Sequence, residues 1–306
     1  MKKSIETFKS SNGSDSITYY VYPPDTEPRG VLQVSHGMCE YLERYENLAE
    51  FLGQAGFVVC GNDHLGHGRT CPPERLGYFA TEDGWKYLVE DLYKLTGRIK
   101  QRYAGIPYFM LGHSMGSFIL RQYLTQYSEG LSGAILCGTS GGLPIIKEGI
   151  MLAEYLKRTR GEFYRSKKLT TMVFGAYNRK YAEHNSDFDW LSRNEKVVQR
   201  YEKDANCNFI FTASGYKDLF LLLSEVSKKE WPYLLPKSLP ILVMSGDMDP
   251  VGEFGEGVKK VYQSLQEAQI TDLTLQLYSQ ARHELLNDSC AQEVMQDILH
   301  WMEKRL

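Results

Sequence analysis

The chain has 306 residues, of which 42% are apolar and 24% are charged, and its formal net charge is −3. This composition is typical of a globular protein with a sizeable core, and the charge balance gives no general attraction to nucleic acid, so we expect no nucleic-acid partner. The opening stretch "MKKSIETFKSSNG" has no apolar run typical of a signal peptide, and no segment reaches the ~20 apolar residues of a membrane span.

The six cysteines form no C-x-x-C pair, so without a secretory signal we expect free thiols and a cytoplasmic protein. His64 and His67 are three residues apart, but they lie in a glycine-rich stretch with no third ligand nearby. We therefore predict that the protein uses neither a metal ion nor another cofactor.

The predicted elements begin with two segments of alternating apolar residues, 3–9 and 16–22, separated by "SSNGSD". This pattern is typical of an antiparallel hairpin. Strand and helix patterns then alternate, which indicates βαβ units and a parallel sheet. The strand patterns cover 31–35, 57–63, 107–112 and 133–138, and the helical patterns cover 44–56, 83–103 and 118–127.

From about residue 144 to 236 the pattern is mostly helical and rich in aromatic and charged residues. The alternation resumes afterwards, with strands at 240–247 and 273–278 and helices at 257–268 and 292–306. We expect one α/β core made of residues 1–143 and 237–306, interrupted by a helical cap at 144–236.

Two stretches match Gly-x-Ser-x-Gly, "GHSMG" around Ser114 and "GTSGG" around Ser140. A serine becomes an efficient nucleophile in this motif when it sits on a sharp turn between a strand and a helix. Ser114 has a strand pattern before it and a helical pattern after it, whereas Pro144 argues against a helix directly after Ser140. We predict that Ser114 is the nucleophile and Ser140 a loop residue.

A serine nucleophile needs a base and an acid. In folds that carry the serine on such a strand–turn–helix turn, they follow it in the order Ser, Asp, His. His283 follows the strand 273–278 in a loop, whereas His300 lies within the predicted terminal helix. We therefore predict His283 as the base. Asp247 and Asp249 both follow the strand 240–247, and the Gly-x-x-Asp spacing favours Asp249 as the acid, with Asp247 as a turn carboxylate.

The oxyanion that forms during acyl transfer needs two backbone N–H donors. One is expected from Met115, the residue after the nucleophile, and the other from the loop "SHGMCEY", where we predict the N–H of Met38. The side chain of His36 in this loop is interpreted as a packing group.

With these residues placed, the chain resembles the α/β-hydrolase superfamily, and within it the branch of monoacylglycerol lipases and lysophospholipases. The resemblance extends over nearly the whole chain and rests on "VSHGMCEYLERY", "DHLGHGRT", "GHSMG", "GDMDPV" and "ARHE", in the family's order. It implies a mostly parallel eight-stranded sheet with helices on both faces and a helical cap after the sixth strand. It also implies that Ser114, Asp249 and His283 form the triad and that Met38 and Met115 supply the oxyanion donors.

Glu40 and Arg44 match substrate-binding positions of the animal monoacylglycerol lipases, but the same two residues could also pair with each other at a helix start. The family's second histidine, three positions after the base, is Leu286 here, so its glycerol-binding network does not carry over whole. The stretch around His64 and His67 corresponds to a structural loop of the family.

The function expected from these residues is hydrolysis of a small-molecule carboxylic ester or lipid with a lipophilic acyl chain. A proline-iminopeptidase-like peptidase would use the same triad, together with a cap carboxylate that holds a free amine. Candidates for that carboxylate are Glu154, Glu162, Glu183, Asp187 and Asp189. A third possibility is a non-catalytic receptor on the same scaffold, against which an intact triad argues.

The predicted cap is interpreted as a lid over the acyl pocket, in which Phe174 and Leu222 are expected to line the pocket. Its stretch "YLKRTRGEFYRSKKL" interleaves basic and aromatic residues and could make transient contact with an anionic membrane surface, or could simply be a solvated helix face. The basic residues are Lys157, Arg158, Arg160, Arg165, Lys167 and Lys168.

Overall fold

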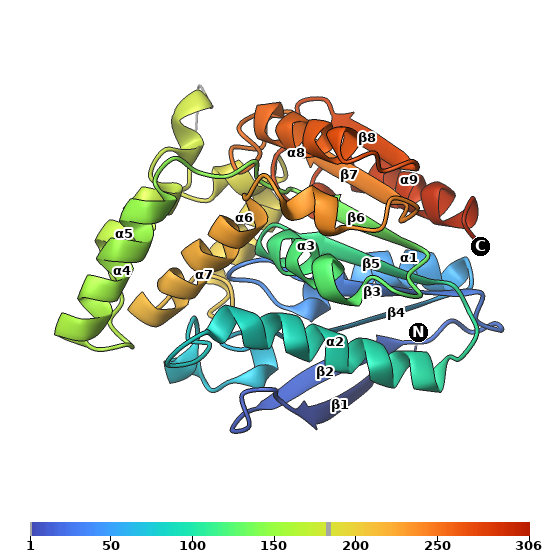
Figure 1. The fold of residues 1–306 in the computed structure, drawn as a ribbon, viewed down its shortest axis with the longest axis horizontal. Helices are drawn as coiled ribbons and strands as arrows, with labels where there is room; N and C mark the ends of the chain where they lie inside the picture. Colours follow the sequence, from blue (N-terminus) through green and yellow to red (C-terminus); the bar gives the residue numbers. More distant parts are fainter. Residues whose placement is uncertain (1, 182–184) are drawn as a thin grey trace.

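The computed structural model describes residues 2–181 and 185–306. Eight strands form one sheet in the order β1-β2-β4-β3-β5-β6-β7-β8 (Figure 1). The strands are β1 (Ser4–Lys9), β2 (Ser16–Tyr22), β3 (Gly30–Ser35), β4 (Phe57–Asn62), β5 (Tyr108–His113), β6 (Gly133–Cys137), β7 (Ile241–Gly246) and β8 (Leu273–Tyr278).

The first two strands form the predicted hairpin, and β2 also runs antiparallel to β4. All the other pairings in the sheet are parallel, from β4 through β3, β5, β6 and β7 to β8. The prediction of a mostly parallel eight-stranded sheet is therefore confirmed.

Helices cover both faces of the sheet because side chains alternate along each strand. Leu32, Phe109 and Ile135 point toward α1 (Glu46–Gln54) and α9 (Ala291–Glu303), where Trp301 completes the layer. Val31, Met110 and Leu136 face the opposite layer, formed by α2 (Gly84–Arg102), α3 (Met115–Tyr127) and α8 (Glu256–Glu267).

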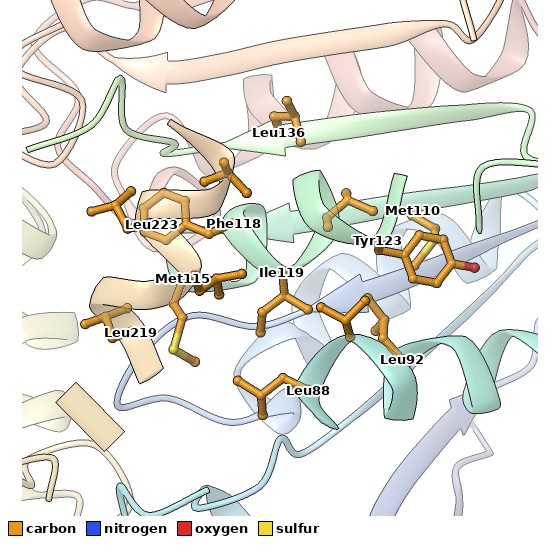
Figure 2. Close-up of a cluster of buried hydrophobic side chains, with 14 of the residues drawn as sticks. Leu88, Leu92, Met110, Met115, Phe118, Ile119, Tyr123, Leu136, Leu219 and Leu223 are labelled. Carbon is orange, nitrogen blue, oxygen red and sulfur yellow. The ribbon is translucent and has the colours of Figure 1, made fainter. Parts of the chain in front are cut away.

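A helical segment lies between β6 and β7, as expected for a cap after the sixth strand. It contains α4 (Ile146–Arg160), α5 (Lys167–Phe174), α6 (Glu195–Lys203) and α7 (Ala213–Val226). These four helices gather at one end of the sheet, on the left in Figure 1. Leu219 and Leu223 of α7 pack beside Met115 and Phe118 of α3, so the segment is joined to the core by apolar contacts (Figure 2).

The buried guanidinium of Arg121 on α3 makes a second connection to this segment. It donates to the carbonyl oxygens of Ser140, at 2.9 Å, and of Val226, the last residue of α7. Its charge lies 4.3 Å from the ring centre of Trp231, a favourable cation–π distance. The carbonyls at the end of a helix carry partial negative charge, so this arginine stabilises the end of α7.

All six cysteines are free thiols, as the sequence predicts. Within the two described stretches, no helix combines the length and the apolar character that crossing a membrane requires.

Asp218 on α7 is an unusual buried carboxyl at the contact between the helical segment and α2. Its side chain lies against Gly84, and within the described residues its Oδ2 has no hydrogen-bond partner. Burial raises the pKa of Asp218 from 3.8 to about 7, despite the opposing charges of Lys217 and Lys157. The folded state therefore binds this proton over a pH range in which the unfolded chain has released it.

We expect Asp218→Asn to stabilise the protein at alkaline pH. The stability of the wild type should fall as pH rises from the unfolded pKa of 3.8 to the folded value of about 7, because over this range the unfolded chain releases a proton that the folded state keeps. Asparagine resembles the protonated acid and escapes this loss. The variant's melting temperature should exceed that of the wild type by several degrees at about pH 8.5 and by less at about pH 5. An equal difference at both pH values would contradict the assignment.

Candidate active site

Ser114 lies on the sharp turn that joins β5 to α3, with φ 53° and ψ −123°. A side chain on Gly116 would collide with the backbone of Ser35, and one on Gly112 would collide with Gly116 itself. Strand, turn and helix therefore come together only because both motif positions are glycine. Ser140 has no such setting, because it lies in a loop and its Oγ accepts a hydrogen bond from the N–H of Gly142 at 3.2 Å.

Asp249 and His283 meet at the same end of the sheet, in the loops that follow β7 and β8. The distance from His283 Nδ1 to Asp249 Oδ2 is 2.9 Å, and both side chains are buried. The carboxylate also accepts hydrogen bonds from Ser245 Oγ, at 3.1 Å, and from the N–H of Val251, at 2.9 Å. These donors fix the orientation of the carboxylate. Because the carboxylate binds Nδ1 of His283, the other ring nitrogen, Nε2, points away from it.

The structure places Asp249, the predicted acid, beside His283, and Asp247, the alternative, elsewhere. Asp247 Oδ1 accepts a hydrogen bond from the N–H of Gln280 at 2.6 Å, which is the turn contact considered from the sequence. His300 lies in α9. Ser114 and His283 line one cavity, although no hydrogen bond between Ser114 Oγ and His283 Nε2 is present within the described residues. Such bonds often form only when substrate is bound.

The loop after β3 approaches Ser114 closely enough to supply an oxyanion donor. A Cβ on Gly37 would lie 3.0 Å from the Cβ of Ser114. The N–H of Gly37 donates to Glu40 Oε1, and the N–H of Cys39 donates to His67 Nε2 at 3.2 Å. Between them, the N–H of Met38 makes no hydrogen bond to any part of 2–181 or 185–306, which leaves it free for a substrate oxygen.

Met115 occupies the first position of α3, where backbone N–H groups have no partner within the helix. Met38 and Met115 both line the cavity that contains Ser114. The two predicted donors are thus gathered around the predicted nucleophile.

Glu40 and Arg44 belong to a buried network beside this cavity. Glu40 Oε1 accepts hydrogen bonds from Tyr45 Oη, at 2.9 Å, and from His113 Nδ1, at 2.8 Å. Arg44 Nε lies 3.7 Å from Glu40 Oε2, and another guanidinium nitrogen lies 2.5 Å from Glu284 Oε2. Glu40 lines the cavity, and the contact between Glu40 and Arg44 has the spacing of a helix-start pair; their substrate-binding role stays a prediction.

The sequence alone does not indicate a role for His113, which directly precedes the nucleophile in "GHSMG". Burial alone would lower the pKa of His113, but the adjacent Glu40 carboxylate outweighs it, so that the pKa is raised. Burial likewise disfavours the charged form of Glu40, yet its pKa lies below the usual range because His113 and Arg44 are close. The two side chains therefore favour a charged pair beneath the catalytic loops.

The cavity has a volume of about 540 Å³ and is lined mainly by apolar side chains. Its walls come from the loops of the sheet and from the helical segment, which contributes Phe174, Tyr177, Trp190, Phe209 and Phe220. Phe174 lines the cavity as predicted. The prediction for Leu222 is wrong: this residue faces the core of the protein, while its neighbours Phe220 and Leu223 line the cavity.

The three histidines of the neighbouring loops are engaged with one another and with the backbone. His36 Nε2 accepts the N–H of His64 at 3.0 Å, and the two rings lie 4.2 Å apart. Burial lowers the pKa values of His36, His64 and His67, which keeps these rings neutral. In the described part of the chain, no group of three or more His, Cys, Asp or Glu residues has the arrangement of a metal site.

The chain is similar, over nearly its whole length, to known proteins that are named as lipases and esterases. The monoacylglycerol lipase of Mycolicibacterium smegmatis is 27% identical, over 96% of this chain and 95% of its own length. The monoglyceride lipase of Rattus norvegicus is 28% identical, over 93% of this chain and 86% of its own length. The crystal structure of a thermostable carboxyl esterase from Bacillus coagulans in complex with glycerol superimposes with a TM-score of 0.90 at 30% identity, covering 100% of this chain and 99% of that one.

The sequence pattern of one protein family, described as "Serine aminopeptidase, S33", matches residues 26–290. This match includes the elbow around Ser114 and the loops that carry Asp249 and His283. With its eight-stranded, mostly parallel sheet and its nucleophile elbow, the chain belongs to this family of α/β-hydrolases.

Proposed function

We propose that the chain hydrolyses carboxylic esters with a lipophilic acyl chain, such as monoacylglycerols or lysophospholipids, through an acyl-enzyme on Ser114. The observation that carries the proposal is the 2.9 Å hydrogen bond between His283 and Asp249 in the cavity that also contains Ser114. The apolar walls of this cavity suit an acyl chain, because each buried CH₂ group contributes about 0.8 kcal/mol to binding.

In the proposed mechanism, Ser114 Oγ attacks the ester carbonyl carbon while His283 Nε2 takes the hydroxyl proton. The N–H groups of Met38 and Met115 stabilise the oxyanion of the tetrahedral intermediate. The C–O bond then breaks, and the proton on His283 passes to the departing alcohol. Water, activated by the same histidine, hydrolyses the acyl-enzyme and releases the acid. Asp249 keeps the imidazole in the required tautomer and stabilises its charged form.

The lipase relatives and the esterase structure that holds glycerol support an ester as the substrate. The family description names an aminopeptidase, which would need a carboxylate from the helical segment in the cavity to hold a free amine. Of the five candidates from the sequence, Glu183 lies outside the described residues. Among the other four only Asp187 lines the cavity, and it lies at an exposed position; Glu154, for example, pairs with Lys217 at 2.7 Å. This distribution favours the esterase over the peptidase.

We further propose that residues 144–236 act as a lid on a core formed by 1–143 and 237–306. The cavity lies between the two parts, with the helical segment supplying much of its apolar lining. Its outer helix α4 exposes Met151 to 72% and Tyr155 to 62%, and Arg158, Arg160, Lys167 and Lys168 are exposed near them in sequence. Lys157 and Arg165 are instead turned inward, onto Glu82 and the carbonyl of Ile210. The exposed set suits transient contact with an anionic membrane surface.

The proposed function predicts that Ser114→Ala removes almost all hydrolysis of a long-chain monoacylglycerol, whereas Ser140→Ala retains most of it. Loss of the nucleophile costs several orders of magnitude in turnover in other serine hydrolases. The measurement compares release of fatty acid with release of the arylamine from a proline arylamide. Preference for the arylamide in the wild type would support the peptidase, and near-normal activity of Ser114→Ala would exclude Ser114 as the nucleophile.

The lid surface is tested by sedimentation with anionic and with neutral vesicles, at low and at high salt. We expect binding only to anionic vesicles at low salt, because the interaction of exposed charges is screened by salt. Replacing Met151 and Tyr155 by serine should weaken this binding several-fold. Tyr233 and Leu234, each 62% exposed, provide a control pair for the same replacement. Binding that ignores lipid charge, or that depends equally on both pairs, would contradict the proposal.

A further inference from the structure

The loop that carries His283 is bound on its outer side by a short stretch of the helical segment, residues 189–193, which we call the base strap. The N–H of His283 donates to the carbonyl of Trp190 at 3.3 Å, and the N–H of Glu284 donates to the carbonyl of Leu191 at 2.7 Å. Both donor residues are buried, so these N–H groups would lack a partner without the strap. The backbone of the base is therefore fixed by the helical segment as well as by the sheet.

Side chains connect the same two stretches in both directions. Arg282, the residue before the base, donates to the carbonyl oxygens of Asp189 and of Ser192, the latter at 3.1 Å. Arg193 Nε donates to Asp288 Oδ1 at 2.8 Å, and this carboxylate is completely buried. Hydrogen bonds to a charged group are roughly twice as strong as those between neutral groups. The two ends of the strap are thus held by charged contacts.

The ring of Trp190 completes the arrangement at the imidazole itself. Its centre lies 5.1 Å from that of His283, at an interplanar angle of 41°. The ring centre of His113 lies 4.7 Å from that of His283, and Asp249 accepts a hydrogen bond from Nδ1 of His283. Trp190 is itself held in place: the ring centre of Tyr177 lies 4.9 Å from its own, and its backbone N–H donates to Asn178 Oδ1 at 3.0 Å.

We infer that Trp190 is a positioning residue for the imidazole of His283 and that the base strap, residues 189–193, fixes the loop on which this histidine lies. The inference rests on the proposed function of His283 as the base for Ser114. Its consequence is that part of the helical segment belongs to the catalytic framework: the strap must stay in place for proton transfer. A displacement of about 1 Å in such a group can reduce turnover about 100-fold.

The alternative role for Trp190 is that of cavity wall, since it also lines the acyl pocket. The two roles affect different kinetic constants. A wall residue would change KM for long-chain esters and leave a short acetate ester untouched, because the acetyl group does not reach the wall. A positioning residue would lower kcat for both esters, with little change in KM.

The test measures kcat and KM for p-nitrophenyl acetate and for a long-chain ester in Trp190→Leu and Trp190→Phe, at a temperature where both variants are folded. We expect Trp190→Leu to lower kcat at least about 10-fold on both esters, and Trp190→Phe to restore most of it, because phenylalanine keeps a ring against the imidazole. A change in KM for the long-chain ester alone would overturn the inference.

Arg193→Gln tests the strap outside the cavity, since neither Arg193 nor Asp288 lines it. We expect a several-fold lower kcat on both esters. Arg29→Gln, which breaks the exposed pair with Glu303, is the matched control and should have wild-type kinetics. Equal effects of the two arginine changes would contradict the strap.

The rate at which a small fluorophosphonate labels Ser114 separates this inference from the proposed function. Labelling needs the nucleophile and its base but no ester substrate. A wild type that labels quickly but hydrolyses no ester would contradict the proposed function alone, and the strap would still be judged by slower labelling of Trp190→Leu. Labelling of this variant at the wild-type rate would overturn the inference, even if ester hydrolysis by the wild type is confirmed.

Discussion

The hydrogen bond between Asp249 and His283 is the contact on which the arrangement of the site depends. It is buried, and the carboxylate keeps two further donors, Ser245 and the N–H of Val251, so it is held in one orientation. A buried carboxylate is stable only when its oxygens are paired in this way. Ser114 and the two oxyanion donors can act on a substrate in the cavity only if this bond fixes the imidazole of His283 beside them.

The order of the strands explains why residues so distant in sequence converge. β3 lies between β4 and β5 and runs parallel to both. The loops that follow β3 and β5 therefore leave the sheet at the same end of its strands. Open α/β sheets bind their ligands at this end, beyond the carboxyl ends of the strands. The loops after β7 and β8 reach the same end and bring Asp249 and His283 there. The helical segment then covers the site and, through Trp190, contacts the base directly.

The sequence predicts best those features that depend on neighbours along the chain. Alternating residues predict the first two strands, short apolar stretches predict the others, and the turn context distinguishes Ser114 from Ser140. The contact of His113 with Glu40, and that of Trp190 with His283, join residues 73 and 93 positions apart and leave no local pattern. Leu222 was misplaced for a related reason: α7 is apolar on several sides, and periodicity alone does not say which side faces the cavity.

The most direct test of the account is a comparison of Asp249→Asn with Asp247→Asn in purified, folded protein. The two carboxylates are two residues apart, but only Asp249 contacts the imidazole. We expect Asp249→Asn to lower kcat for ester hydrolysis by about 10⁴-fold, because the imidazole loses its correct tautomer. Asp247→Asn should stay close to the wild type. Equal losses in both variants, or a larger loss in Asp247→Asn, would contradict the account.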